Sequence, residues 1–224
     1  MRRCAAGAVA DIGNGWTAPG DRYVTKILFL PGAGASASFW RPVADLLDPG
    51  RERHFFAWPG LGNEPHDPKV QGVDDLVSMV LAELDGPCDL IAQSLGGLVA
   101  IRVALSAPKK VRRLVLAVTS GGVPVRDLGG IDWRIGYRRE FPNAAGWITD
   151  ANRTSEDLSA KLGSIDAPSL LIWGDADPIS PPSVGQRLHQ LLPHARLRII
   201  RGGGHDLAQT HAGEVATLIA DHLR

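Results

Sequence analysis

Short apolar runs alternate with amphipathic stretches along most of this chain. The clearest amphipathic stretch spans residues 73–84, where apolar side chains recur at i, i+3, i+4, i+7 and i+8 and acidic side chains take the outer side. This spacing predicts a helix with one buried face. Further helices are predicted at 38–47, 98–105, 156–162, 182–192 and 215–223, and Ser38 is a candidate cap for the first of these.

The apolar runs between these helices are short and bounded by glycine or proline, which is typical of buried strands. They predict strands at 24–30, 54–58, 88–93, 111–118, 170–173 and 197–200, with a candidate further strand at 8–12. Strands that alternate with helices form βαβ units, so we expect a mostly parallel sheet of about six to seven strands with helices on both faces. We interpret residues 1–224 as a single α/β domain. Its site should lie where the C-terminal ends of the strands meet.

Regular periodicity fails between residues 120 and 152. An irregular stretch of this length inside a compact domain is usually a functional lid or a disordered loop, and its aromatic side chains favour a lid at about residues 120–160. Trp133 and Trp147 are candidates for lining an apolar pocket beneath it. Arg134, Arg138 and Arg139 could hold an anionic substrate group or form the solvated face of a short helix.

Composition narrows the choice of ligand. The 24 basic side chains are balanced by 24 acidic ones, so we expect neither nucleic acid nor an anionic membrane as a partner. The expected ligand is a small-molecule substrate. Cys4 and Cys88 make neither a disulfide framework nor a metal site and suit a reducing cytoplasm. No apolar run reaches the roughly 20 residues of a membrane helix. Neither a G-x-G-x-x-G nor a lysine-ended Walker pattern is present, so a phosphate-binding loop is not favoured. We expect no cofactor and no metal. The oligomeric state is left open.

The sequence L-I-A-Q-S-L-G-G at residues 90–97 joins a predicted strand to a predicted helix. Ser94 therefore lies on a tight turn that exposes its hydroxyl above the sheet edge, and Ala92 and Gly96 flank it where larger side chains would collide. A serine hydroxyl is a weak nucleophile until a base reaches it, and this placement makes it accessible to one. The stretch resembles the G-x-S-x-G nucleophile elbow of the α/β-hydrolase family, with Ala92 in place of the first glycine.

Two further features follow predicted strands in the order that this family uses. Asp177 ends the stretch G-D-A-D at 174–177 and matches the family's G-x-x-D acid, with Asp175 as the alternative. His205 follows three glycines at 202–204 and matches the family's base. The resemblance thus implies that Ser94, Asp177 and His205 are the nucleophile, acid and base of a catalytic triad.

The turn P-G-A-G at residues 31–34 follows the first clear strand. It resembles the family's His-Gly turn, with Pro31 in place of the histidine. Because that turn lends a main-chain N–H to an oxyanion hole, the resemblance implies Ala33 and Leu95 as the two donors. A glycine-rich turn without a catalytic role is the alternative.

Taken over residues 24–224, the resemblance implies a compact serine carboxylesterase or thioesterase that acts through an acyl-enzyme intermediate. Carbon–carbon hydrolysis, lactone opening and a lyase step are alternatives on the same triad, and a non-catalytic ligand receptor is an alternative of another class. Haloalkane and epoxide chemistry is not expected, because those relatives have an aspartate at the position of Ser94. We expect Trp133 and Trp147 to contact substrate, with Phe39 and Trp40 as the alternative lining.

Overall fold

The structure, a computed structural model, describes residues 25–224. Its centre is a six-stranded, wholly parallel sheet with the strand order β2-β1-β3-β4-β5-β6. The strands are β1 (Ile27–Leu30), β2 (Arg53–Phe55), β3 (Cys88–Gln93), β4 (Val111–Ala117), β5 (Ser169–Gly174) and β6 (Ala195–Ile200). Every residue of β1, β3 and β5 is buried, as expected of strands covered on both faces. The candidate strand at 8–12 lies outside the described residues.

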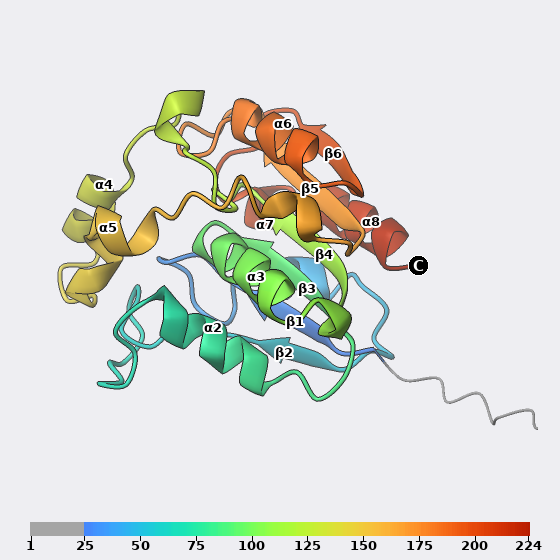
Figure 1. Ribbon diagram of the computed structural model, residues 1–224, viewed down its shortest axis with the longest axis horizontal. Coiled ribbons are helices and arrows are strands. Elements are labelled where there is room, and N and C mark those ends of the chain that lie inside the picture. Colours follow the sequence, from blue (N-terminus) through green and yellow to red (C-terminus); the bar gives the residue numbers. More distant parts are fainter. Residues whose placement is uncertain (1–24) are drawn as a thin grey trace, which may run out of the picture.

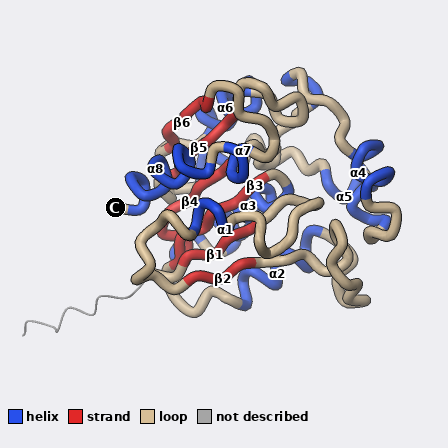
Figure 2. The backbone as a smooth tube through the Cα atoms, turned by 180° about the vertical axis from the view of Figure 1, so that it is seen from behind, coloured by secondary structure: helices blue, strands red, loops and turns tan. Residues whose placement is uncertain are grey.

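Helices cover both faces of the sheet, which confirms the predicted fold class. Figure 1 shows α2, α3 and α6 on the near face, and Figure 2 shows α1, α7 and α8 on the opposite one. The α-helices are α1 (Arg41–Ala44), α2 (Val73–Ala82), α3 (Leu95–Ser106), α4 (Arg134–Glu140), α5 (Ala151–Thr154), α6 (Pro182–Leu191), α7 (Leu207–Thr210) and α8 (Ala212–Leu223). Short 3₁₀ helices lie at Pro108–Lys110, Arg126–Leu128, Gly146–Thr149 and Leu162–Ser164.

Two of the predicted helices are wrong in extent or kind. The helix expected at 38–47 is reduced to α1, and Ser38 does not cap it because the N-cap position is Trp40. The Ser38 hydroxyl bonds that of Ser36 at 2.8 Å. No α-helix forms at 156–162. There the N–H of Leu158 donates to the carbonyl of Gly122 at 2.6 Å, so the apolar spacing of that stretch reflects burial of Leu158 and Leu162 without a helix.

Residues 118–168, the β4–β5 segment, join the C-terminal end of β4 to the N-terminal end of β5, and α4 and α5 of this segment stand apart from the sheet (Figure 1). Hydrogen bonds attach this segment to the loop after β2. The N–H of Ala145 donates to the carbonyl of Gly60 at 2.7 Å, and Nε2 of His66 bonds the carbonyl of Asn143 at 2.8 Å. These bonds hold residues 143–145 of the segment against the loop after β2. None of the helices within residues 25–224 is long and apolar enough to cross a membrane.

Candidate active site

The turn between β3 and α3 holds Ser94 in a strained backbone conformation. Its φ and ψ are 52° and −120°, and among the described non-glycine residues only Ser94 and Val118 have a positive φ. A conformation of this kind costs about 1–3 kcal/mol and persists only where its surroundings enforce it. Here the N–H of Ser94 donates to the carbonyl of Ala117 at 3.1 Å, which ties the turn to β4. The backbone thus has the shape expected of a nucleophile elbow.

Small residues around Ser94 are required by close contacts across this turn. A Cβ added to Gly96 would lie 2.5 Å from the carbonyl oxygen of Leu30 and 2.6 Å from that of Pro31. A Cβ added to Gly32 would lie 3.1 Å from the Cβ of Ser94. These approaches bring the turn after β1 directly against the elbow.

The structure brings together the three side chains predicted from separate parts of the chain. Nε2 of His205 lies 3.0 Å from Oγ of Ser94, and Nδ1 lies 2.7 Å from Oδ2 of Asp177. The Asp177 side chain is fully buried, whereas that of His205 is 26% exposed. An Nδ1–H that donates to Asp177 leaves Nε2 as the acceptor for the Ser94 hydroxyl. The row of three groups can therefore carry a proton from Ser94 to His205.

The two aspartates of the loop after β5 make different contacts. Oδ1 of Asp177 accepts the N–H groups of Ile179 at 2.8 Å and Ser180 at 3.2 Å, which fixes the carboxylate that faces His205. Asp175 instead accepts the N–H of Gly202 at 2.6 Å from an exposed position. Asp175 thus stabilises the turn after β6 and does not contact the imidazole ring.

Ala33 and Leu95 lie on the two turns that meet at Ser94. Leu95 is the first residue of α3, where main-chain N–H groups have no partner within the helix. Ala33 follows Gly32, whose backbone packs against the Ser94 side chain. Leu95 thus follows Ser94 directly, Ala33 lies one residue beyond the contact with Ser94, and both residues are buried.

Sequence reasoning missed two residues that position this row. Nε2 of Gln93 donates to the carbonyl of His205 at 3.0 Å, which holds the histidine loop over β3. Oγ1 of Thr119 donates to the carbonyl of Ser94 at 2.6 Å and accepts the N–H of Gly121 at 3.0 Å. Their only signal in the sequence is a polar side chain at or just after the end of a buried strand.

A third missed residue, Ser180, links the acid loop to this arrangement. Its hydroxyl donates to the carbonyl of Thr119 at 3.1 Å and accepts from Nε1 of Trp173 at 3.1 Å. Because Ser180 also donates its N–H to Asp177, a continuous set of hydrogen bonds connects the acid to the elbow. Buried polar groups that are satisfied in this way make a site rigid.

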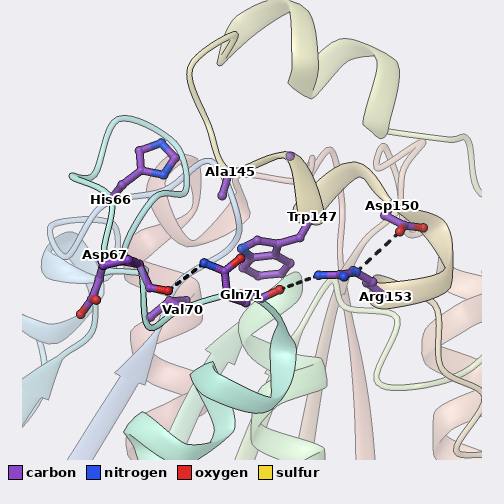
Figure 3. Close-up of a pocket in the computed structure, with 10 residues that line it drawn as sticks. His66, Asp67, Val70, Gln71, Ala145, Trp147, Asp150 and Arg153 are labelled. Carbon is purple, nitrogen blue, oxygen red and sulfur yellow. Dashed lines mark hydrogen bonds and ion pairs between the residues drawn. The ribbon is translucent and has the colours of Figure 1, made fainter.

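A cavity of about 600 Å³ lies between the loop after β2, which leads to α2, and the β4–β5 segment. Figure 3 shows Gln71 and Trp147 among the lining residues, with Arg153 between Gln71 and Asp150. Trp147 is 7% exposed, and within the described chain its Nε1 has no hydrogen-bond partner. The cavity is lined by His66, Asp67, Pro68, Val70, Gln71, Ala145, Gly146, Trp147, Asp150 and Arg153.

No group of three or more His, Cys, Asp or Glu side chains within residues 25–224 is arranged to hold a metal ion.

The other aromatic candidates lie elsewhere. Trp133 packs edge-on against Tyr137, with ring centroids 5.4 Å apart, and does not line the cavity. Trp40 is 1% exposed, and its Nε1 donates to the carbonyl of Leu30 at 3.1 Å, so it packs in the core. Phe39 packs edge-on against Trp40 at 5.5 Å. Trp40 therefore has a structural role: it connects the turn before α1 to β1.

The arginines of the β4–β5 segment bond mainly within that segment. Arg134 makes an ion pair with Asp132 at 3.1 Å, and Arg138 donates to the hydroxyl of Thr149. Burial favours the neutral form of Asp132, but the Arg134 main-chain N–H and guanidinium outweigh it and hold the pKa of this carboxyl below its usual value. Arg134 is thus engaged in stabilising the segment.

Comparison with known proteins identifies the class. Residues 27–218 match the model of the alpha/beta hydrolase family, and the chain belongs to that family. It is 29% identical to the polyketide synthase ThaQ of Burkholderia thailandensis over 92% of this chain, although the match spans only 12% of that protein. It is 27% identical to a pimeloyl-[acyl-carrier protein] methyl ester esterase of Neisseria meningitidis serogroup C, over 89% of this chain and 94% of the esterase.

The solved structures lead to the same fold. A meta-cleavage product hydrolase from Pseudomonas fluorescens IP01 (CumD) is similar with a TM-score of 0.73 and 17% identity, over 89% of this chain and 90% of that one. The expected resemblance is therefore confirmed at the level of fold and family. The protein is an enzyme of the α/β hydrolase family, with esterases among its relatives.

Proposed function

We propose that this enzyme is a serine esterase or thioesterase in which Ser94 is the nucleophile, His205 the general base and Asp177 the acid that orients it. The observation that carries the proposal is the row of hydrogen bonds from Ser94 Oγ through His205 to the buried Asp177, with lengths of 3.0 and 2.7 Å. The strained elbow at Ser94 supports it, because such strain is characteristic of functional sites. Similarity to a methyl ester esterase supports the choice of an ester as substrate.

In the first half of the reaction, Oγ of Ser94 attacks the carbonyl carbon of the ester while its proton passes to Nε2 of His205. Asp177 accepts the Nδ1–H and stabilises the imidazolium. The negative charge on the former carbonyl oxygen is held by the N–H groups of Ala33 and Leu95. When the tetrahedral intermediate collapses, the bond to the leaving group breaks, and the alcohol or thiol departs with the proton from His205.

In the second half, water attacks the acyl-enzyme. His205 takes a proton from that water, and the same two N–H groups again hold the oxyanion. Collapse of this intermediate breaks the bond to Ser94 Oγ, which regains its proton from His205. The products are a carboxylic acid and the free enzyme.

For the substrate we propose a small-molecule acyl ester or thioester whose apolar portion packs against Trp147. The cavity of about 600 Å³ beside that indole is the basis for this choice, and Ser94, Asp177 and His205 are not among the residues that line it. We propose that the β4–β5 segment, which supplies one wall of the cavity, acts as the lid at about residues 120–160. Trp133 remains a candidate for substrate contact from the same segment. Phe39 is the remaining candidate beside α1, since Trp40 already packs in the core.

Covalent labelling by a fluorophosphonate probe tests the nucleophile. The wild-type enzyme should be labelled and Ser94→Ala should not, and His205→Ala should lose both labelling and turnover of p-nitrophenyl esters. Ser164→Ala is a matched control, because Ser164 is an exposed serine whose hydroxyl bonds the carbonyl of Lys161 at 2.8 Å. Equal labelling of wild type and Ser94→Ala would contradict the proposal. Labelling at Ser94 without turnover of any ester or thioester would favour carbon–carbon cleavage, lactone opening or a lyase step on the same triad.

A further inference from the structure

A tyrosine on α4 reaches from the β4–β5 segment to the turn that carries Ala33. The hydroxyl of Tyr137 donates to the carbonyl of Ala33 at 3.1 Å and accepts the N–H of Gly62 at 2.7 Å. The residue is 7% exposed, so both bonds are shielded from water. One phenol thus joins α4, the turn after β1 and the loop after β2.

Packing around Tyr137 holds the same turn from a second side. The rings of Tyr137 and Phe141 lie 4.9 Å apart. Phe141 lies so close to Gly34 that a Cβ there would be 2.9 Å from its Cε2 atom. A Cβ on Gly62 would in turn lie 3.3 Å from the carbonyl oxygen of Gly34. The ring of Tyr137 on α4, the ring of Phe141 directly after α4 and the loop after β2 therefore enclose residues 33–34.

We propose that Tyr137 is a positioning residue for the oxyanion hole, so that the Ala33 N–H is aimed correctly only while α4 is docked on the turn. Glycines on both sides of Ala33 leave the backbone there free to rotate unless other groups hold it. The Tyr137 hydroxyl fixes the carbonyl of Ala33, and the N–H of Ala35 donates to the carbonyl of Gly32 at 3.3 Å. With the peptide groups on both sides held, the N–H of Ala33 has a defined direction.

This inference rests on the proposed function, because it assigns Ala33 as an oxyanion donor. It adds that the docking of α4 on the turn and the alignment of the Ala33 N–H depend on the same hydrogen bond. Burial raises the pKa of Tyr137 above its ordinary value of 10, and the nearby Glu140 carboxylate raises it further, while the Gly62 N–H opposes the shift. The phenol therefore keeps the proton that it donates to Ala33 at neutral pH.

Tyr137→Phe removes the hydroxyl and keeps the ring. We expect the rate of fluorophosphonate labelling and kcat for a p-nitrophenyl ester to fall by about 10- to 100-fold, somewhat less than the loss of an oxyanion donor itself, with KM little changed. Affinity for a trifluoromethyl ketone, whose adduct with Ser94 places an oxyanion in the hole, should fall by a similar factor. A merely structural role would lower the melting temperature without this parallel loss.

The matched control is Thr149→Val. Thr149 also has a hydroxyl with two partners, since it accepts from Arg138 on α4 and donates to the carbonyl of Gly146 at 3.2 Å, but it does not reach the turn. This variant should label and turn over like wild type. Unchanged labelling and ketone affinity in Tyr137→Phe, or the same loss in Thr149→Val, would overturn the inference alone. Failure of the wild type to label at Ser94 would overturn the proposed function and this inference with it.

A second variant decides the question if Tyr137→Phe does not fold. Phe141→Leu keeps the hydroxyl but trims the ring that packs on Tyr137 and Gly34, so it loosens the docking of α4. Phe141→Leu should reduce the labelling rate and the ketone affinity by similar factors, and both factors should be smaller than in Tyr137→Phe. Wild-type labelling and ketone binding in that variant would overturn the inference.

Discussion

The contacts of individual side chains decide between the two aspartates of the loop after β5. Asp177 is buried and faces His205, whereas Asp175 is exposed and holds the N–H of Gly202. Only the first can orient an imidazole and stabilise its charge. The sequence motif G-x-x-D favours Asp177, and the side-chain contacts supply the physical reason for that choice.

Asp177→Asn should therefore reduce kcat by a factor on the order of 10⁴, because the amide stabilises neither the required tautomer nor the imidazolium. Asp175→Asn should have little effect, since an asparagine oxygen can still accept the Gly202 N–H. Rates on a p-nitrophenyl ester, measured with proteins of equal melting temperature, check this ranking. The reverse ranking would transfer the acid role to Asp175.

Among the elements, α3 crosses β1 so closely that only glycine fits at one position. A Cβ on Gly96 would meet the carbonyl oxygens of Leu30 and Pro31, which are backbone atoms and cannot turn aside. By contrast, Gly136 on α4 has no neighbouring atom within 4 Å of such a Cβ. A glycine-to-alanine substitution should therefore lower the free energy of unfolding at Gly96 and should not lower it at Gly136.

Gly96→Ala should lower the free energy of unfolding by about 1–3 kcal/mol, the usual range for overpacking, and should also displace the elbow. Gly136→Ala should be neutral or stabilise the protein by up to about 1 kcal/mol, because alanine is the better helix former. Urea unfolding of both variants, together with Ser94 labelling, measures the difference. Similar stability and labelling in the two variants would contradict the packing argument.

On the scale of the whole molecule, the cavity beside Trp147 exists because two segments far apart in the chain meet above the sheet edge. Residues 66–71 supply one wall and residues 145–153 the other (Figure 3). Trp133 lies in the β4–β5 segment outside residues 145–153 and packs on Tyr137 away from the cavity. Selectivity for acyl chain length should therefore depend on Trp147 more than on Trp133.

Trp147→Ala should shift the preferred chain length of p-nitrophenyl esters toward longer or bulkier acyl groups, because it enlarges the cavity, and Ser94 labelling should persist. Trp133→Ala is the matched variant and should change this ranking less. A series of esters of graded length measures both. An unchanged ranking in both variants would place the selectivity pocket elsewhere, with Phe39 as the next position to test.

The sequence by itself predicts the layered parallel fold, and it predicts Ser94, Asp177 and His205 as candidates, because those signals are local. Each strand, turn and motif is encoded by residues a few positions apart. The prediction failed where local spacing had another cause, as at 156–162, where Leu158 is buried and its N–H is taken by Gly122. A single domain and a cytoplasmic location stay predictions.

Tertiary structure alone decided which distant groups meet. The bond from Gln93 to His205 joins residues 112 positions apart, and that from Tyr137 to Ala33 joins residues 104 apart. No periodicity or motif reports such pairs, because they depend on how the β4–β5 segment and the loops pack above the sheet. The physical reason is that a hydrogen bond needs two partners at about 3 Å, and a local pattern describes only one of them.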